Sequence, residues 1–123
     1  MSALQMVCHL SDSFRMAIGE KAVSDVGGAL KQTVVKCIAL YLPMRWPTGL
    51  LTRPEVDQEG GGTPPLDFAA DVAHLTRLVE LISADTRHFA WRPTHPMFGR
   101  MSEADWLRWS YLHMDHHLRQ FGV

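Results

Sequence analysis

Apolar side chains recur every three or four residues along much of this chain, which is the spacing of one face of a helix. The pattern predicts helices over residues 3–18, 66–84 and 103–121. In the first two, the apolar positions are Val7, Leu10, Phe14, Ile18, Phe68, Val72, Leu75, Val79 and Ile82. No segment alternates apolar and polar residues for long enough to form a sheet. The predicted class is therefore all-α, a bundle of helices.

Residues with capping character mark where two of these helices begin. Ser2 is followed three positions later by Gln5, and Ser102 by Asp105, which is the arrangement of a capping box. A further segment, residues 29–42, is rich in β-branched side chains, so a strand is an alternative there. Its length and its helical neighbours favour a helix.

A long connection, residues 43–65, follows this segment and is rich in proline and glycine. Loops of this length inside a compact domain are uncommon and are usually either functional or disordered. Trp46 and Leu50 predict that the first half packs onto the body over a pocket, whereas the half with Gly60–Gly62 is expected to be a plain tether. The chain of 123 residues is predicted to form a single domain, 1–123.

Net charge, the length of apolar runs and the cysteines limit which partners and which cellular location the sequence implies. The net charge is −1 without a basic cluster, so neither nucleic acid nor an anionic membrane surface is implied. No apolar run approaches the ~18 residues of a membrane span, and the N-terminus lacks the pattern of a signal peptide. Cys8 and Cys37 lack metal-site spacing and are expected to be reduced, buried thiols of a cytoplasmic protein.

The last predicted helix carries three of the seven histidines within a run of five residues: His113, His116 and His117. His113 and His117 are one turn apart on one face, a separation at which two imidazoles can bind the same metal ion. Trp106 and Trp109 share that face, so the imidazoles are expected to point into the interior. A buried imidazole pair without partners would be costly there.

His9 is the candidate third ligand, because it borders the apolar stripe of the first helix. Three histidines from two helices would form an open site, which is typical of a catalytic metal, and imidazole suits Zn, Ni, Fe or Cu. From the residues alone, His116 competes with His117 as a ligand. Asp12, one turn after His9, is a candidate ligand, orienting group or base, with a solvated side chain as the alternative.

Four segments resemble a bacterial branch of the DinB-like (DinB/YfiT) superfamily: QMVCHLSDSFRMAIGE, PMRWPTG, GGTPPLDFAADVAHL and HPMFGRMSEADWLRWSYLHMDHHLRQFG. The likeness covers nearly the whole chain. It implies a four-helix bundle that holds a divalent metal, usually Zn or Ni, through one histidine of the second helix and a His-x-x-x-His pair of the last. By motif these ligands fall on His9, His113 and His117, which leaves His116 outside the ligand set.

The resemblance also implies a function. Better-known members use low-molecular-weight thiols, so a metal-dependent transferase, isomerase or hydrolase on a small, thiol-linked substrate is expected. Its candidate residues are Asp12, His116 and Gln120 for catalysis or orientation, and Trp46, Trp106 and Trp109 for the pocket. The alternative is a non-catalytic bundle that the metal stabilises or that dimerises.

The first helix of the superfamily has no counterpart before Leu4, so we expect either that Met1 is an internal methionine or that the bundle lacks or truncates that helix. Such a bundle would leave an apolar face uncovered along residues 3–18 or 68–82. Exposed apolar patches of more than a few hundred Å² mark association sites. We therefore expect a homodimer in which a second copy covers that face.

Overall fold

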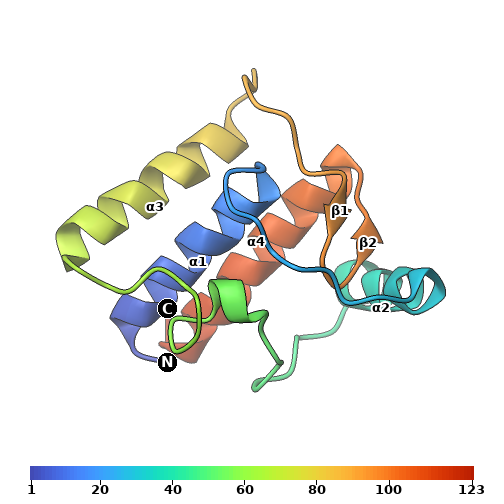
Figure 1. Cartoon of the computed structure of the whole chain (residues 1–123), viewed down its shortest axis with the longest axis horizontal. Coiled ribbons are helices and arrows are strands. Elements are labelled where there is room, and N and C mark those ends of the chain that lie inside the picture. Colours follow the sequence, from blue (N-terminus) through green and yellow to red (C-terminus); the bar gives the residue numbers. More distant parts are fainter.

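Four helices make up most of the protein (Figure 1). The structure is a computed structural model that describes residues 1–123. Along the chain the elements are α1 (Ala3–Ala17), α2 (Ala29–Tyr41), the 3-10 turn η1 (Pro54–Val56), α3 (Phe68–Ser83), β1 (Thr94–His95), β2 (Gly99–Arg100) and α4 (Glu103–Gln120). The predicted all-α class is confirmed, and the strand alternative for residues 29–42 is wrong.

Capping boxes begin α1 and α4, as predicted. The Ser2 hydroxyl accepts from the Gln5 N–H at 3.2 Å, and the Gln5 side chain accepts from the Ser2 N–H at 2.7 Å. Ser102 and Asp105 repeat this exchange at 3.1 and 3.0 Å. Each box satisfies two backbone N–H groups that a helix start leaves without partners, and caps of this kind contribute about 1 kcal/mol.

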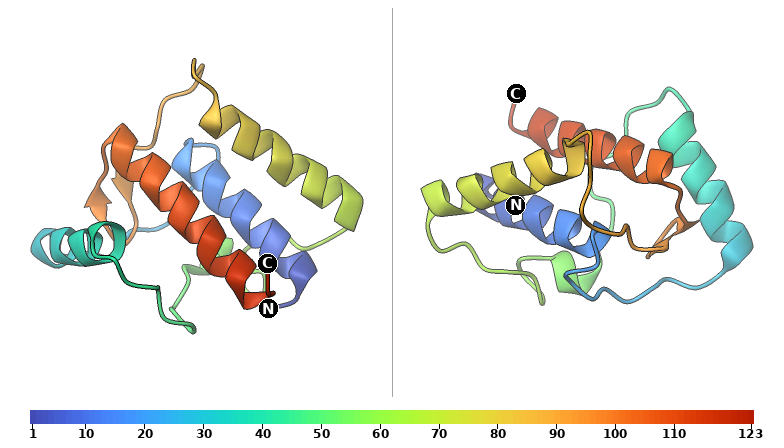
Figure 2. Two further views of the ribbon diagram at one scale, coloured as in Figure 1. Left: turned by 180° about the vertical axis from the view of Figure 1, so that it is seen from behind. Right: turned by 90° about the horizontal axis from the view of Figure 1, so that it is seen from above.

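Helix α1 is the centre of the bundle and lies between α3 and α4 (Figures 1 and 2). Its residues from Met6 to Phe14 are all buried. Core residues from the flanking helices are Leu75, Leu78, Ile82, Trp106 and Trp109. The sequence analysis expected an uncovered apolar face on either residues 3–18 or residues 68–82. The face on residues 3–18 is covered.

One side of this three-helix layer carries no further segment (Figure 2, left). Apolar side chains remain exposed on both outer helices. Phe68 and Val72 of α3 are 51% and 37% exposed, and Tyr111 of α4 is 69% exposed. The face on residues 68–82 is thus partly uncovered, as the second alternative proposed.

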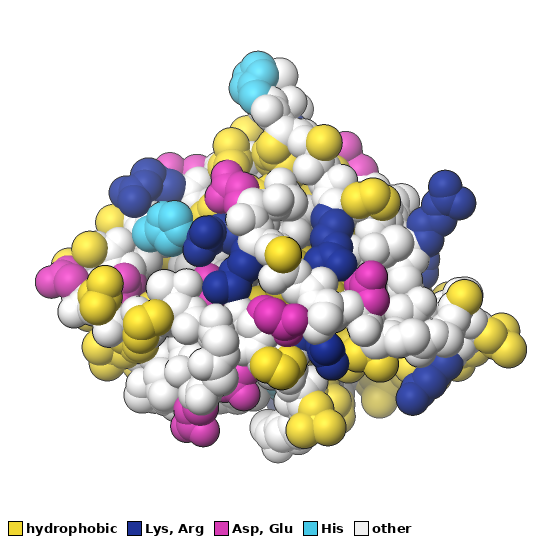
Figure 3. Space-filling view, viewed as in Figure 1, with side chains coloured by type: hydrophobic (Ala, Val, Ile, Leu, Met, Phe, Trp, Pro, Cys, Tyr) yellow, Lys and Arg dark blue, Asp and Glu magenta, His cyan; other side chains and the backbone are white.

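Helix α2 lies outside the layer, near the start of α4 (Figure 1). The Asp105 carboxylate binds it by accepting from Tyr41 Oη and from Lys36 Nζ. Leu40 is its only buried residue, and Leu30 is 82% exposed. Figure 3 shows the resulting apolar surface at the right edge of the molecule. No helix of the protein combines the length and apolar character that crossing a bilayer requires.

A short hairpin, made of the two-residue strands β1 and β2, packs against α2; the sequence pattern did not predict it. Its register pairs Thr94 with Arg100 and His95 with Gly99. Gly99 has φ +67°, and a Cβ there would lie 3.0 Å from the side chain of Gln32, so this turn requires glycine. The hairpin places the buried ring of His95 against Phe98, Trp106 and Trp109.

Candidate metal centre

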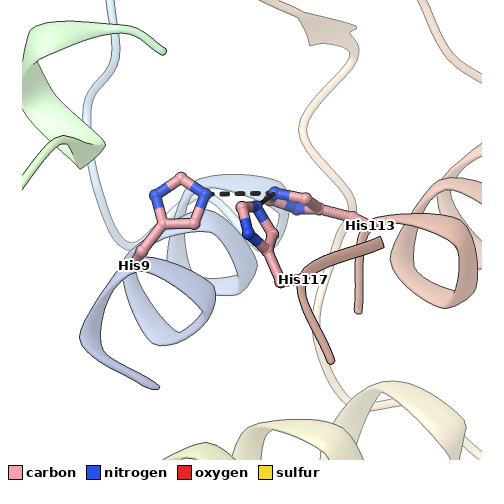
Figure 4. A group of neighbouring side chains, drawn as sticks. All are labelled: His9, His113 and His117. Atoms are coloured by element: carbon pink, nitrogen blue, oxygen red, sulfur yellow. Dashed lines mark hydrogen bonds between the residues drawn. The ribbon is translucent and has the colours of Figure 1, made fainter. Parts of the chain in front are cut away.

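Three buried histidines meet between α1 and α4 (Figure 4). Nε2 of His113 lies 3.1 Å from Nε2 of His9 and 3.0 Å from Nε2 of His117. One nitrogen from each ring falls within 4.8 Å of the others. The structure therefore brings together the three residues that the sequence singled out as ligands.

Hydrogen bonds alone cannot satisfy these three nitrogens. Nδ1 of His9 lies 2.7 Å from the Val56 carbonyl, which can only accept, so Nδ1 carries the proton and Nε2 of neutral His9 is an acceptor. If Nε2 of His113 carries a proton and donates it to Nε2 of His9, this nitrogen has no lone pair left to accept a hydrogen bond from His117. If Nε2 of His113 instead accepts from Nε2 of His117, it faces Nε2 of His9, which is also an acceptor. One of the two N···N contacts is therefore left unpaired.

A single cation would satisfy all three nitrogens. Zn–N bonds of about 2.0–2.1 Å in a tetrahedral site place neighbouring nitrogens about 3.3–3.4 Å apart. The N···N separations of 3.0 and 3.1 Å are close to that spacing. The third pair, His9 and His117, lies within 4.8 Å, so the three residues fit one transition-metal ion once their rings draw slightly closer.

Burial keeps the three imidazoles in the neutral form that binds metal. It is the main cause that lowers the pKa of His9, holds that of His113 well below its ordinary value of 6.5 and lowers that of His117 to about 4. Neighbouring imidazoles lower the pKa of His113 and His117 further, because two positive charges in one site repel. No proton competes strongly with a metal ion at neutral pH.

The three ligands are oriented by different means. His9 donates to the Val56 carbonyl at the end of η1, the kind of contact that fixes a metal-binding tautomer. Nδ1 of His113 and Nδ1 of His117 have no hydrogen-bond partner. Packing holds these two rings instead: the ring of His113 lies 4.8 Å from those of Trp109 and His117. His9 is thus the only ligand that a loop positions.

Asp12 holds that loop and does not reach the histidines. Its buried carboxylate accepts from the Thr63 N–H at 2.7 Å and the Thr63 hydroxyl at 2.8 Å, and it pairs with Lys21 at 3.2 Å. The Gly60–Gly62 segment also packs on η1, where the Gly61 N–H donates to the Pro54 carbonyl at 2.7 Å. This segment is therefore not the plain tether that its composition predicted, and the contacts of Asp12 are structural.

We expect an Asp12→Ala variant to loosen the loop and to weaken metal binding. Removing the buried carboxylate leaves the N–H and hydroxyl of half-buried Thr63 and the ammonium of Lys21 without their partner, which should lower the free energy of unfolding by about 2–3 kcal/mol. Because the same loop carries the Val56 carbonyl, the metal Kd should rise about tenfold or more. Urea unfolding and metal titration measure the two effects. Glu59→Ala, in the same loop but exposed and without a side-chain partner, should change neither the free energy of unfolding nor the metal Kd, and equal behaviour of both variants would contradict the assignment.

A cavity of about 500 Å³ adjoins the histidines. Trp46 and Trp109 line it, and so do His116 and Gln120, whose side chains lie 3.0 Å apart. The expectation for Trp106 is wrong. It is fully buried, outside the cavity lining, and donates through Nε1 to the Arg92 carbonyl at 2.7 Å.

His95 is a cavity residue that the sequence analysis missed. It is buried, stacks on Phe98 with ring centroids 4.3 Å apart, and accepts from the Met97 N–H at 3.1 Å. It lies in an irregular connection without helical periodicity, so only its place in the HPMFG segment of the resemblance could have indicated it. Burial lowers its pKa to about 3.

His95 should make the protein less stable in acid. Its pKa is lower in the folded chain than the ordinary 6.5, so below that pH the unfolded chain binds the proton more readily. The free energy of unfolding should therefore fall as pH falls, by about 2–3 kcal/mol between about pH 7 and pH 4.5 for this group. A His95→Phe variant should lose this part of the pH dependence. Urea unfolding of both proteins with a chelator measures the difference, and parallel pH profiles would contradict it.

These features define a class: an all-α helical-bundle protein with a buried three-histidine centre that can hold a metal ion. The chain belongs to the family described as Protein of unknown function (DUF1569), which matches residues 3–122. No curated protein and no solved structure matches the chain. The family description assigns no activity, so function has to be argued from the site.

Proposed function

We propose that this protein is a metal-dependent enzyme in which His9, His113 and His117 bind Zn or Ni. The observation that carries the proposal is the convergence of three neutral Nε2 atoms that hydrogen bonds cannot satisfy, next to a cavity. One histidine from one helix and a His-x-x-x-His pair from the last is the ligand pattern of the DinB-like superfamily, and we place the family there.

A divalent ion in this centre supplies Lewis acidity and lowers the pKa of a coordinated water or thiol. The protein supplies the walls and a proton acceptor. His116 lies next to His117, with ring centroids 5.1 Å apart, and burial lowers its pKa, so it is neutral at pH 7. We assign His116 to proton transfer in the cavity. Gln120, which contacts Nε2 of His116, is a positioning residue.

The substrate we propose is a small, thiol-linked molecule, and the reaction a transfer, an isomerisation or a hydrolysis. The cavity volume of about 500 Å³ suits a small molecule. We also propose a cytoplasmic location. Both cysteines are unpaired. Cys8 is buried as predicted, but the prediction is wrong for Cys37, which is exposed, and an exposed thiol persists as a thiol in a reducing compartment.

Metal analysis and cobalt spectroscopy test this function. Protein purified without a metal-affinity tag should carry about one transition metal ion per chain. In the Co²⁺-substituted protein, 2-mercaptoethanol should add a thiolate charge-transfer band in the near ultraviolet. Failure to take up Zn, Ni or Co would overturn the proposal. A bound metal whose spectrum no thiol or anion changes would indicate a closed structural site, and with it the non-catalytic alternative.

We further propose that a second copy covers the exposed apolar side chains of the outer helices, Phe68 and Val72 of α3 and Tyr111 of α4. A two-fold contact pairs identical patches, so one apolar face is sufficient for a dimer. Light scattering should give twice the chain mass of 13.9 kDa. Val72→Asp should give single chains because it buries a charge, whereas Leu30→Asp, on exposed α2, should not. A wild-type mass of one chain would contradict the dimer.

A further inference from the structure

The permanently charged side chains that line the cavity are all positive. No aspartate or glutamate lines it, and its charged side chains are Arg45 and Arg53, both from the loop at 43–65. Neither arginine forms an ion pair. Guanidinium groups stay protonated in proteins, so both charges are permanent. A metal ion in the centre would add to the positive potential.

Arg53 also has hydrogen-bonding capacity left. One of its terminal nitrogens donates to the Ser24 hydroxyl, but its Nε is buried and has no partner. The nearby carboxylate of Glu55 accepts from the Ser24 N–H at 3.0 Å through one oxygen, and its other oxygen is likewise buried and forms no hydrogen bond with Arg53. A buried donor without an acceptor is costly, and a ligand with acceptor oxygens would relieve that cost.

The remaining wall of the cavity is mainly apolar and aromatic. Val35 and Ile38 come from α2, Trp46 and Leu50 from the loop, and Phe98 from the hairpin. Ring centroids of Trp46 and Phe98 lie 6.5 Å apart. The polar lining thus includes the two loop arginines, histidines of α1, α4 and the hairpin, and the neutral side chains of Ser13, Thr52 and Gln120, with an apolar surface for the body of a ligand.

We propose that the cavity binds a small organic carboxylate with an apolar body, which places its negative group on Arg45 and Arg53. A cationic ligand would meet two permanent positive charges and no carboxylate. The preference for anions depends on the arginines and the apolar wall alone. That such a carboxylate is the substrate rests on the proposed function of the metal centre.

Calorimetry with three probes of one shape tests the preference: 3-phenylpropionate, its neutral amide and the cationic 3-phenylpropylamine. The acid should bind at least tenfold more tightly than the amide, and the amine more weakly still. In an Arg45→Gln, Arg53→Gln double variant the acid and amide should bind within twofold of each other, with amide affinity unchanged. Arg77→Gln, an exposed arginine of α3, should behave as wild type.

Three outcomes would overturn the proposal: no binding of the acid at millimolar concentration, equal affinity for acid and amide, or a preference that the double variant keeps. The same titrations on chelator-treated protein separate this proposal from the metal centre. The preference should persist without metal. If it vanishes with the metal, the anion binds the ion and not the arginines. If the protein never binds metal but keeps the preference, the proposed function fails and the carboxylate site stands.

Discussion

A His113→Ala, His117→Ala double variant is expected to lose bound metal completely. These two residues supply two of the three nitrogens that meet at 3.0 and 3.1 Å, and His9 alone offers a single imidazole. Removing two ligands of three leaves no chelating site, so metal content should fall from about one ion per chain to below about a tenth. Elemental analysis of desalted protein, purified without a metal-affinity tag, measures the loss.

The matched control is His116→Ala. His116 lies on the same helix between the two ligands, yet its ring is half-buried and contacts Gln120 outside the cluster of three. This variant should keep its metal and lose turnover. Metal retained by the double variant, or lost from His116→Ala, would contradict the ligand assignment. Circular dichroism of both variants confirms that the helices remain, so that metal loss is not a result of unfolding.

Local signals located the helix ends where the responsible residues are close in sequence. A capping box needs only residues three apart, so the starts of α1 and α4 at Ala3 and Glu103 agree with prediction. Helix α3 was expected from residue 66 but begins at Phe68. There Asp67 is the cap, and its carboxylate accepts from the Ala70 N–H at 2.8 Å.

The arrangement of the helices depends on contacts that no local pattern records. Periodicity identifies an apolar face but does not say what covers it. Helix α2 shows this, because its one buried residue is Leu40 and polar groups attach it to α4. The attachment joins Lys36 and Tyr41 to Asp105, more than sixty positions away. Such pairs follow from the fold and cannot be read from either segment alone.

The cluster of three histidines could be predicted because helices carry it, and the loop residues around it could not. His113 and His117 are related by one helical turn, and His9 by its place beside the stripe of α1. The carbonyl of Val56, which orients His9, belongs to a single 3-10 turn, and the ring of His95 belongs to a two-residue strand; both elements are too short to give a periodic pattern. Asp12 was misjudged for the same reason, since its partner Thr63 lies in the loop.

Trp106→Ala should have the largest effect on stability of any single substitution considered. Trp106 is 0% exposed, stacks on Trp91 with ring centroids 5.9 Å apart and donates to the Arg92 carbonyl at 2.7 Å. Alanine leaves a cavity and an unpaired carbonyl, so the free energy of unfolding should fall by about 3–5 kcal/mol. Urea unfolding, followed by circular dichroism because a tryptophan is removed, measures it.

Trp46→Ala is the comparison that separates core from cavity wall. Trp46 is half-buried and lines the cavity, so its loss removes less apolar contact and should cost about 1–2 kcal/mol. That variant should instead change ligand binding, because its ring lies 5.8 Å from that of His116. Equal destabilisation by both substitutions would contradict the placement of Trp106.

On a helical wheel of α4, Trp106 and His113 share one broad face, but Trp106 lies almost two turns closer to the start of the helix. Position along the axis therefore decides which of them faces the ligand and which supports the core.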